Sequence, residues 1–166
     1  MGQSERDDEQ RARLLEGLAA SIREKGLPAT QLDDIVRHAR TSKRTFYKHF
    51  PDKDACFVEL AREMSAEVRE QVRGAIDPSA DWQVQAATAI ETYLSILAAD
   101  PAMTVTFAAA SLGPSIVRAQ RDAIEQYALF VQELTASKAF KRAGIVPVSL
   151  ERAYMLVSGL SQTVIR

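Results

Sequence analysis

A short basic segment between residues 37 and 53 carries the side chains whose types best suit a chemical task. The whole chain has a formal net charge of -1, but this segment has a single acidic residue, Asp52. Its basic residues are Arg37, Arg40, Lys43, Arg44, Lys48 and Lys53. A cationic patch confined to one segment is typical of a surface that binds a polyanion. A solvated basic face without a partner is the alternative, and charge alone does not separate the two.

Few residues elsewhere are of the types that carry out catalysis. The chain has one cysteine, Cys56, and two histidines, His38 and His49. It contains no glycine-rich phosphate loop, no His-Glu-x-x-His motif and no Gly-x-Ser-x-Gly motif. His38 and Cys56 could form a thiol–imidazole pair, but a packing role explains each of them. We therefore expect no enzymatic activity, no metal site and no cofactor.

The composition is that of an ordinary folded protein. The 166 residues are 46% hydrophobic and 26% charged, which argues against disorder. A single cysteine allows no intrachain disulfide. No stretch approaches 18 uncharged apolar residues, and the N-terminus lacks the apolar core of a signal peptide. We expect a cytoplasmic protein that makes no membrane contact.

Apolar residues recur at helical spacing almost throughout the sequence, and no segment alternates with period two for the length of a strand. The pattern predicts an all-α protein. Capping residues, among them Thr30, Ser42 and Asp52, then set the ends of the helices together with glycines and prolines. The predicted helices cover about 9–25, 31–39, 43–50, 52–75 and 80–99, one from Pro101, one over 115–137, and one from about Ser149. Between residues 137 and 149 the sequence predicts a basic loop.

The second and third of these helices have the lengths of a helix-turn-helix. They are joined by the four residues from Ala39 to Ser42. Such a unit places its second helix in the major groove of DNA. With Phe46 and Phe50 facing inward, the side chains left outside include Lys43, Arg44 and Tyr47. The two cations can donate to guanine, and Tyr47 can contact a thymine methyl group or a phosphate.

Four further residues around this unit are predicted to hold phosphates without reading sequence. They are Thr30, Thr45, His49 and Lys53. Each is a hydrogen-bond donor or a cation near the reading helix. For three of them a structural role is the alternative: Thr30 as a helix cap, His49 as a partly buried side chain, and Lys53 as a solvated charge.

The same residues carry a resemblance to a known family. Residues 15–60, above all Thr30-Gln-Leu-Asp-Asp-Ile-Val and Ser42-Lys-Arg-Thr-Phe-Tyr-Lys-His-Phe-Pro-Asp-Lys-Asp-Ala, resemble the DNA-binding domain of the tetracycline-repressor (TetR) family. The resemblance implies a homodimer that binds a near-palindromic double-stranded operator through residues 1–53. It also implies a helical body over 54–166 for ligand binding and dimerisation, and repression that a small molecule relieves. A helical interaction or ligand-binding module without DNA binding is the alternative.

Two departures from the family pattern stand out. The family usually has glycine in the turn where this chain has Arg40, at a position that often needs a positive φ. We expect Arg40 to offset the strain by reaching a phosphate. Family members also continue through a further helix beyond the position of Arg166, so the resemblance implies that the body lacks the family's last helix.

The body is expected to bind an apolar effector, because the helix interiors between residues 82 and 110 carry almost no charge beyond Glu91. Large apolar side chains at helical spacing are the candidate pocket walls. They are Trp82, Tyr93, Met103, Phe107, Tyr127 and Phe130, with Tyr154 and Met155 in the last helix. Plain core filling is the alternative for each of them. By analogy with the family, the helix at 115–137 and the last helix form the dimer interface.

Overall fold

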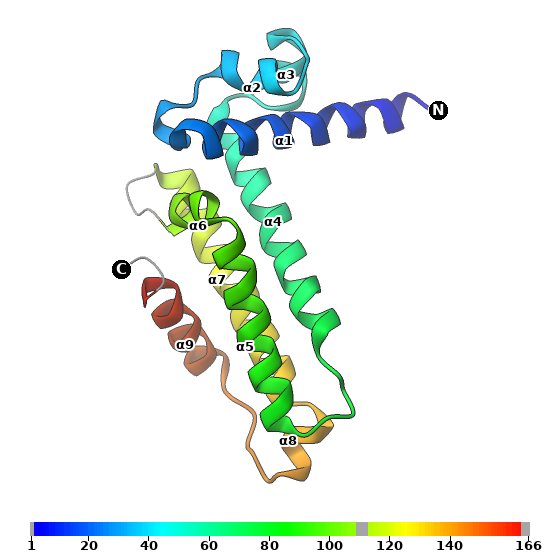
Figure 1. Cartoon of the computed structure of the whole chain (residues 1–166), viewed down its shortest axis with the longest axis vertical. Coiled ribbons are helices and arrows are strands. Elements are labelled where there is room, and N and C mark those ends of the chain that lie inside the picture. The colour runs from blue at the N-terminus through cyan, green and yellow to red at the C-terminus, as the bar shows by residue number, and fades with distance from the viewer. Residues whose placement is uncertain (1, 109–112, 164–166) are drawn as a thin grey trace. The chain divides into compact units, whose positions relative to one another are not determined.

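Every regular element in the described part of the chain is an α-helix (Figure 1). The computed structural model describes residues 2–108 and 113–163. Its helices are α1 (Gln3–Ala29), α2 (Leu32–His38), α3 (Lys43–His49), α4 (Lys53–Ala75), α5 (Trp82–Ala99), α6 (Pro101–Ala108), α7 (Pro114–Thr135), α8 (Lys138–Arg142) and α9 (Leu150–Thr163). The predicted all-α fold is confirmed. None of these helices, as far as they are described, is both long and apolar enough to cross a lipid bilayer.

The long first helix has an interruption where the sequence predicts its end. Gly26 has φ 78° and ψ 158°, outside the helical region, and Pro28 follows it. The regular part of α1 therefore ends next to the predicted residue 25. It begins earlier than predicted, at Gln3 rather than residue 9. One reason is that the Glu5 carboxylate accepts a 2.6 Å hydrogen bond from the amide of Gly2, which caps the first turn.

The caps of α3 and α4 agree with the sequence, whereas the cap of α2 differs by one residue. Ser42 Oγ accepts the amide of Thr45 at 3.1 Å, and Asp52 Oδ1 accepts the amide of Ala55 at 2.7 Å. The N-cap of α2 is Gln31 rather than Thr30, because the hydroxyl of Thr30 donates instead to the carbonyl of Gly26. Thr30 consequently caps the C-terminal end of α1.

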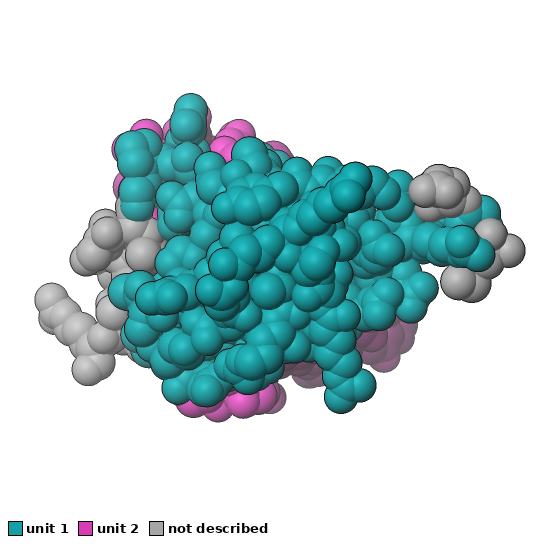
Figure 2. All heavy atoms as spheres, turned by 90° about the horizontal axis from the view of Figure 1, so that it is seen from above, with its two compact units in different colours: residues 1–63, 102–119 teal, residues 64–101, 120–166 magenta. Residues whose placement is uncertain are grey.

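The chain divides into two compact units, which Figure 2 colours separately. Unit 1 comprises residues 1–63 and 102–119. Its core contains side chains from α1 to α4, and the fully buried ones include Leu14, Leu18, Ile22, Ile35, Phe46 and Phe57. In α6, Met103 is buried and the ring of Phe107 stacks on Phe57, with ring centroids 5.3 Å apart. The helices that carry the basic segment therefore each contribute apolar side chains to the buried interior of unit 1.

Unit 2 comprises residues 64–101 and 120–166. Val72 of α4, Ala89 of α5 and Phe130 of α7 form its buried cluster. At one flank of that cluster the guanidinium of Arg73 lies 5.1 Å from the ring centroid of Phe130 and pairs with Glu133 through two hydrogen bonds of 2.8 and 3.0 Å. The second half of α4 is thus held to α7 by apolar burial together with a bidentate ion pair.

Two features of the chain differ from the sequence-based description. The stretch predicted as a basic loop contains the short helix α8, whose Ala139 and Phe140 are buried and anchor it, with Phe140 against Trp82. In addition, α6 and the first turns of α7 belong to unit 1, whereas the sequence assigns everything after residue 53 to the body. The functional division at residue 53 stays a prediction.

Candidate nucleic-acid interface

The turn between α2 and α3 contains a residue with an unusual backbone conformation. Arg40 has φ 51°, and no other non-glycine residue among those described has a positive φ. The turn is closed by the Thr41 amide, which donates to the Val36 carbonyl at 2.9 Å. A left-handed conformation costs a side-chain-bearing residue about 1–2 kcal/mol. The positive φ that the family's glycine suggests for this position is present at Arg40.

Helix α3 turns one face to the core and the other to solvent. Phe46 has no exposed surface, and Phe50, just after the helix, is 5% exposed. Lys43, Arg44 and Lys48 are exposed, and the side chain of Tyr47 is 59% exposed, which is a large value for an aromatic residue. The outward face of α3 thus carries the residue types that the sequence predicted for contacts with bases.

The cations on this face differ in whether they have partners. Lys43 Nζ lies 2.6 Å from Asp33 Oδ1 of α2, and Lys48 Nζ lies 2.5 Å from Asp7 Oδ1 of α1. The side chains of Arg40 and Arg44 make no polar contact with any residue in the described part of the chain. These two guanidinium groups are therefore available to an external anion without breaking an ion pair.

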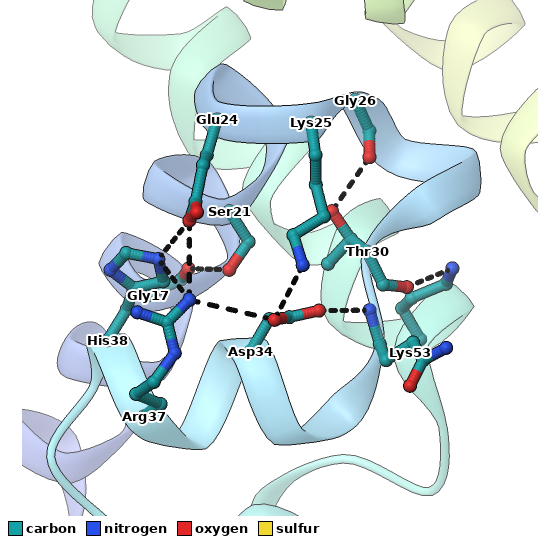
Figure 3. A network of polar contacts seen from close by, with 11 residues as sticks. Gly17, Ser21, Glu24, Lys25, Gly26, Thr30, Asp34, Arg37, His38 and Lys53 are labelled. Atoms are coloured by element: carbon teal, nitrogen blue, oxygen red, sulfur yellow. Dashed lines mark hydrogen bonds and ion pairs between the residues drawn. The ribbon is translucent and has the colours of Figure 1, made fainter.

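Lys53 and Thr30 cooperate in capping the C-terminal end of α1 (Figure 3). Lys53 Nζ donates to the carbonyls of Leu27 at 3.0 Å and of Thr30 at 2.8 Å, and so satisfies acceptors that a helix end leaves open. The side chain of Thr30 is 2% exposed. These contacts give both residues a structural role, and their predicted phosphate contacts remain predictions.

A second polar network in Figure 3 fixes α2 against α1. Asp34 accepts hydrogen bonds from Lys25 Nζ at 2.7 Å and from the Gln31 amide at 2.9 Å. The hydrogen bond from Lys25, followed by that from the Gln31 amide, lowers the pKa of the Asp34 carboxyl to about 2. Arg37 and His38 both contact Glu24 of α1. The guanidinium of Arg37, although exposed, is therefore paired with carboxylates of α1 and α2.

The remaining predicted phosphate ligands lie at the two ends of α3. Thr45 Oγ1 is 3.0 Å from Ser42 Oγ, in the first turn. His49 is partly buried, as the structural alternative for it expected, and its Nε2 atom has no hydrogen-bond partner. It lines an open depression of about 500 Å³ in unit 1, together with Phe50, Arg11 and Arg62 among others. No pattern in the sequence indicated this depression. The phosphate contacts of Thr45 and His49 stay predictions.

The predicted pocket residues lie in separate packing clusters of the two units. Within unit 1, Met103 is buried and Phe107 stacks on Phe57. In unit 2 the rings of Tyr93 and Tyr127 meet edge to face, with centroids 5.5 Å apart. Trp82 packs on Phe140, and Phe130 belongs to the buried cluster with Val72 and Ala89. These contacts agree with core filling, and the ligand pocket remains a prediction.

The one cysteine has the chemistry of a packing residue. Cys56 has no exposed surface, and burial raises the pKa of its thiol to about 12, so the group is protonated at neutral pH. His38 Nε2 lies 2.9 Å from a carboxylate oxygen of Glu24. These surroundings explain each residue without the thiol–imidazole pair that the sequence left open.

Helices α1 to α3, with a capped reading helix and a tight turn before it, define unit 1 as a helix-turn-helix domain of the DNA-binding type. Residues 14–60 match the model of the bacterial regulatory proteins of the tetR family. The match covers the helix-turn-helix part of the chain, the same part that carries the resemblance in the sequence. Relatives found by comparison are transcriptional regulators.

One curated relative is the uncharacterised HTH-type transcriptional regulator YvdT of Bacillus subtilis (strain 168), which is 31% identical to this chain over 83 residues. That match covers 49% of this chain and 43% of YvdT, so the chain spans less than half the length of this relative.

The fold also resembles solved structures over nearly its whole length. The transcriptional regulator FadR from Bacillus subtilis in complex with stearoyl-CoA matches with a TM-score of 0.75 and 18% identity, covering 93% of this chain and 84% of FadR. The fatty acid degradation regulator FadR from Bacillus halodurans matches with a TM-score of 0.77 and 17% identity, covering 94% and 82%. At these identities the likeness shows the fold.

Proposed function

We propose that this protein is a transcriptional regulator that binds double-stranded DNA through the exposed face of α3. The observation that carries the proposal is the solvent-facing set of Arg44 and Tyr47 on a helix whose opposite face, with Phe46, is buried in the core. An arginine near the N-terminal end of a reading helix is suited to donate two hydrogen bonds to guanine. The match of residues 14–60 to the tetR family model and the helix-turn-helix fold support the same function.

Binding-site selection from a random duplex library tests this proposal. The purified chain is expected to enrich one sequence with two related half-sites, and its affinity for that sequence is expected to fall with salt at about 0.9 log units per neutralised phosphate. A helical interaction module without DNA binding would enrich nothing and would show no salt-dependent affinity for any duplex.

Within this function the chain acts as a homodimer, since a near-palindromic site requires two reading helices related by symmetry. The apolar side chains that α9 exposes support an interface there. Met155 is 66% exposed, Leu156 is 56% exposed and Tyr154 is 37% exposed. Sedimentation equilibrium at micromolar concentration is expected to give the mass of two chains, and a monomer would contradict this part of the proposal.

The effector that releases the DNA is apolar, and the protein acts as a repressor in its absence. Helix α5 supports this, because Glu91 is its single charged residue over Trp82–Ala99. The FadR structure in complex with stearoyl-CoA offers a precedent for an acyl ligand on this fold. Adding stearoyl-CoA to the protein–DNA complex is expected to release DNA, with free coenzyme A as the control. Equal release by both compounds would argue against recognition of an apolar chain.

A further inference from the structure

The reading helix is partly neutralised by carboxylates from the protein's own first two helices. Of the three cations in α3, Lys43 pairs with Asp33 of α2 and Lys48 pairs with Asp7 of α1. The third, Arg44, has no polar partner in the described part of the chain. The positive charge that the sequence concentrates in this segment is therefore unevenly distributed at the folded surface.

Each of these carboxylates weakens the attraction between its lysine and an approaching phosphate. The phosphate must share the ammonium group with Asp7 or Asp33, and it is repelled by the carboxylate a few ångströms away. Sequence-independent affinity for DNA depends on how many phosphates the protein neutralises, because each one releases condensed counterions. A lysine whose charge is already balanced contributes less to that number.

We propose that Asp7 and Asp33 limit the sequence-independent affinity of this protein for DNA by holding Lys48 and Lys43. Recognition then rests on the unpaired Arg44 and on Tyr47, whose contacts depend on the bases. This inference rests on the proposed function and names two residues that tune it. A low sequence-independent affinity favours binding to the operator in a cell, because non-specific sites compete with the operator in great excess.

Both ion pairs lie at the protein surface, where they are expected to contribute little to the stability of the fold. All four side chains are substantially exposed, from 35% for Asp7 to 69% for Asp33. Exposed pairs of this kind contribute little to stability. Replacing either carboxylate by its amide is therefore expected to leave the fold intact, which thermal unfolding followed by circular dichroism would verify.

The chain offers a matched control on the same helix. Asp8 is the next residue after Asp7, is exposed, and has no polar partner in the described part of α1 or its surroundings. Asp8→Asn and Asp7→Asn change the net charge equally, but only the second frees a lysine of α3. Asp7→Glu keeps the carboxylate and is expected to behave like the unsubstituted protein.

The test measures affinity for an unrelated duplex as a function of salt, using the full chain and each variant. Asp7→Asn and Asp33→Asn are each expected to steepen the log–log salt slope by about 0.9 per protomer. One additional counterion released per protomer corresponds to about eight-fold tighter binding per half-site at about 0.1 M salt. Asp8→Asn and Asp7→Glu are expected to retain the original slope.

Two results would overturn the inference while leaving the proposed function in place. One is an unsubstituted protein that selects an operator, with Asp7→Asn and Asp33→Asn leaving the slope on unrelated DNA unchanged. The other is an Asp8→Asn variant that steepens the slope as much as Asp7→Asn does. If the unsubstituted protein binds no duplex at any salt concentration, the proposed function itself fails and the inference fails with it.

Discussion

The backbone of Gly17 in α1 lies directly against the carbonyl oxygen of Ile35 in α2. A Cβ atom at residue 17 would be 2.6 Å from that oxygen and 2.9 Å from the amide nitrogen of Ala39. Both neighbours are backbone atoms, so no side chain can move aside to relieve the contact. This close approach sets the position of α2, and through the turn at Arg40 it sets the position of the reading helix.

Gly17→Ala is therefore expected to lower the free energy of unfolding by about 1–3 kcal/mol, the usual cost of overpacking. Chemical denaturation followed by circular dichroism measures this change. Gly74 is the matched control, since nothing lies within 4 Å of a Cβ at that position in α4. Gly74→Ala should leave stability unchanged or raise it by up to about 1 kcal/mol. Equal effects of the two substitutions would contradict the close contact.

Arg40 should show opposite effects on stability and on DNA binding. Arg40→Gly relieves the positive φ and is expected to raise the free energy of unfolding by about 1 kcal/mol. The same substitution removes an unpaired guanidinium and is expected to weaken DNA binding. Arg40→Asn tolerates the left-handed conformation while removing the charge, so it separates the two effects. Unchanged affinity in both variants would exclude a phosphate contact by Arg40.

Substitution of Lys53 separates a structural role of its ammonium group from a contact with DNA. Lys53→Ala removes two charged hydrogen bonds to the carbonyls of Leu27 and Thr30, and is expected to cost about 1.5–3 kcal/mol of stability. Thermal unfolding measures that loss. If Lys53 also holds a phosphate, the salt slope of DNA binding should flatten by about 0.9 per protomer. An unaltered slope with reduced stability would assign Lys53 to capping alone.

The ionisation of Asp34 should make the free energy of unfolding depend on pH in the acid range. Its pKa is lowered from 3.8 to about 2 by Lys25 first and then by the Gln31 amide, so the folded protein favours the ionised form. The resulting stabilisation is present above pH 4 and is lost as the pH falls toward 2. Urea unfolding at several pH values should therefore show a steeper loss of stability in this window for the natural chain than for Asp34→Asn. Parallel curves would show that Asp34 makes no such contribution.

The sequence predicted the helices and the exposed face of α3 because local signals determine both. Ser42 and Asp52 are caps whose function depends on a few neighbouring residues, and Phe46 and Phe50 lie one turn apart on one face. The positive φ of Arg40 was expected from the resemblance, because family members usually have glycine at this position.

Contacts between residues far apart in the chain could not be predicted in the same way. Asp7 and Lys48 are 41 residues apart, and no periodic pattern links an acidic residue near the N-terminus to a reading helix. Lys53 has the residue type of a phosphate ligand, yet its ammonium group reaches the end of α1, 26 residues earlier. The short α8 was missed because its five residues are too few to show helical periodicity.

The central claim is that Arg44 on the exposed face of α3 reads DNA, and a paired binding-site selection tests it most directly. The natural chain and Arg44→Ala would each be selected against the same random duplex library. The natural chain should enrich a two-fold related sequence with guanine at one position of each half-site, and the variant should lose that preference together with about 1–3 kcal/mol of binding free energy. Identical enriched sequences from both proteins, or none from either, would contradict the claim.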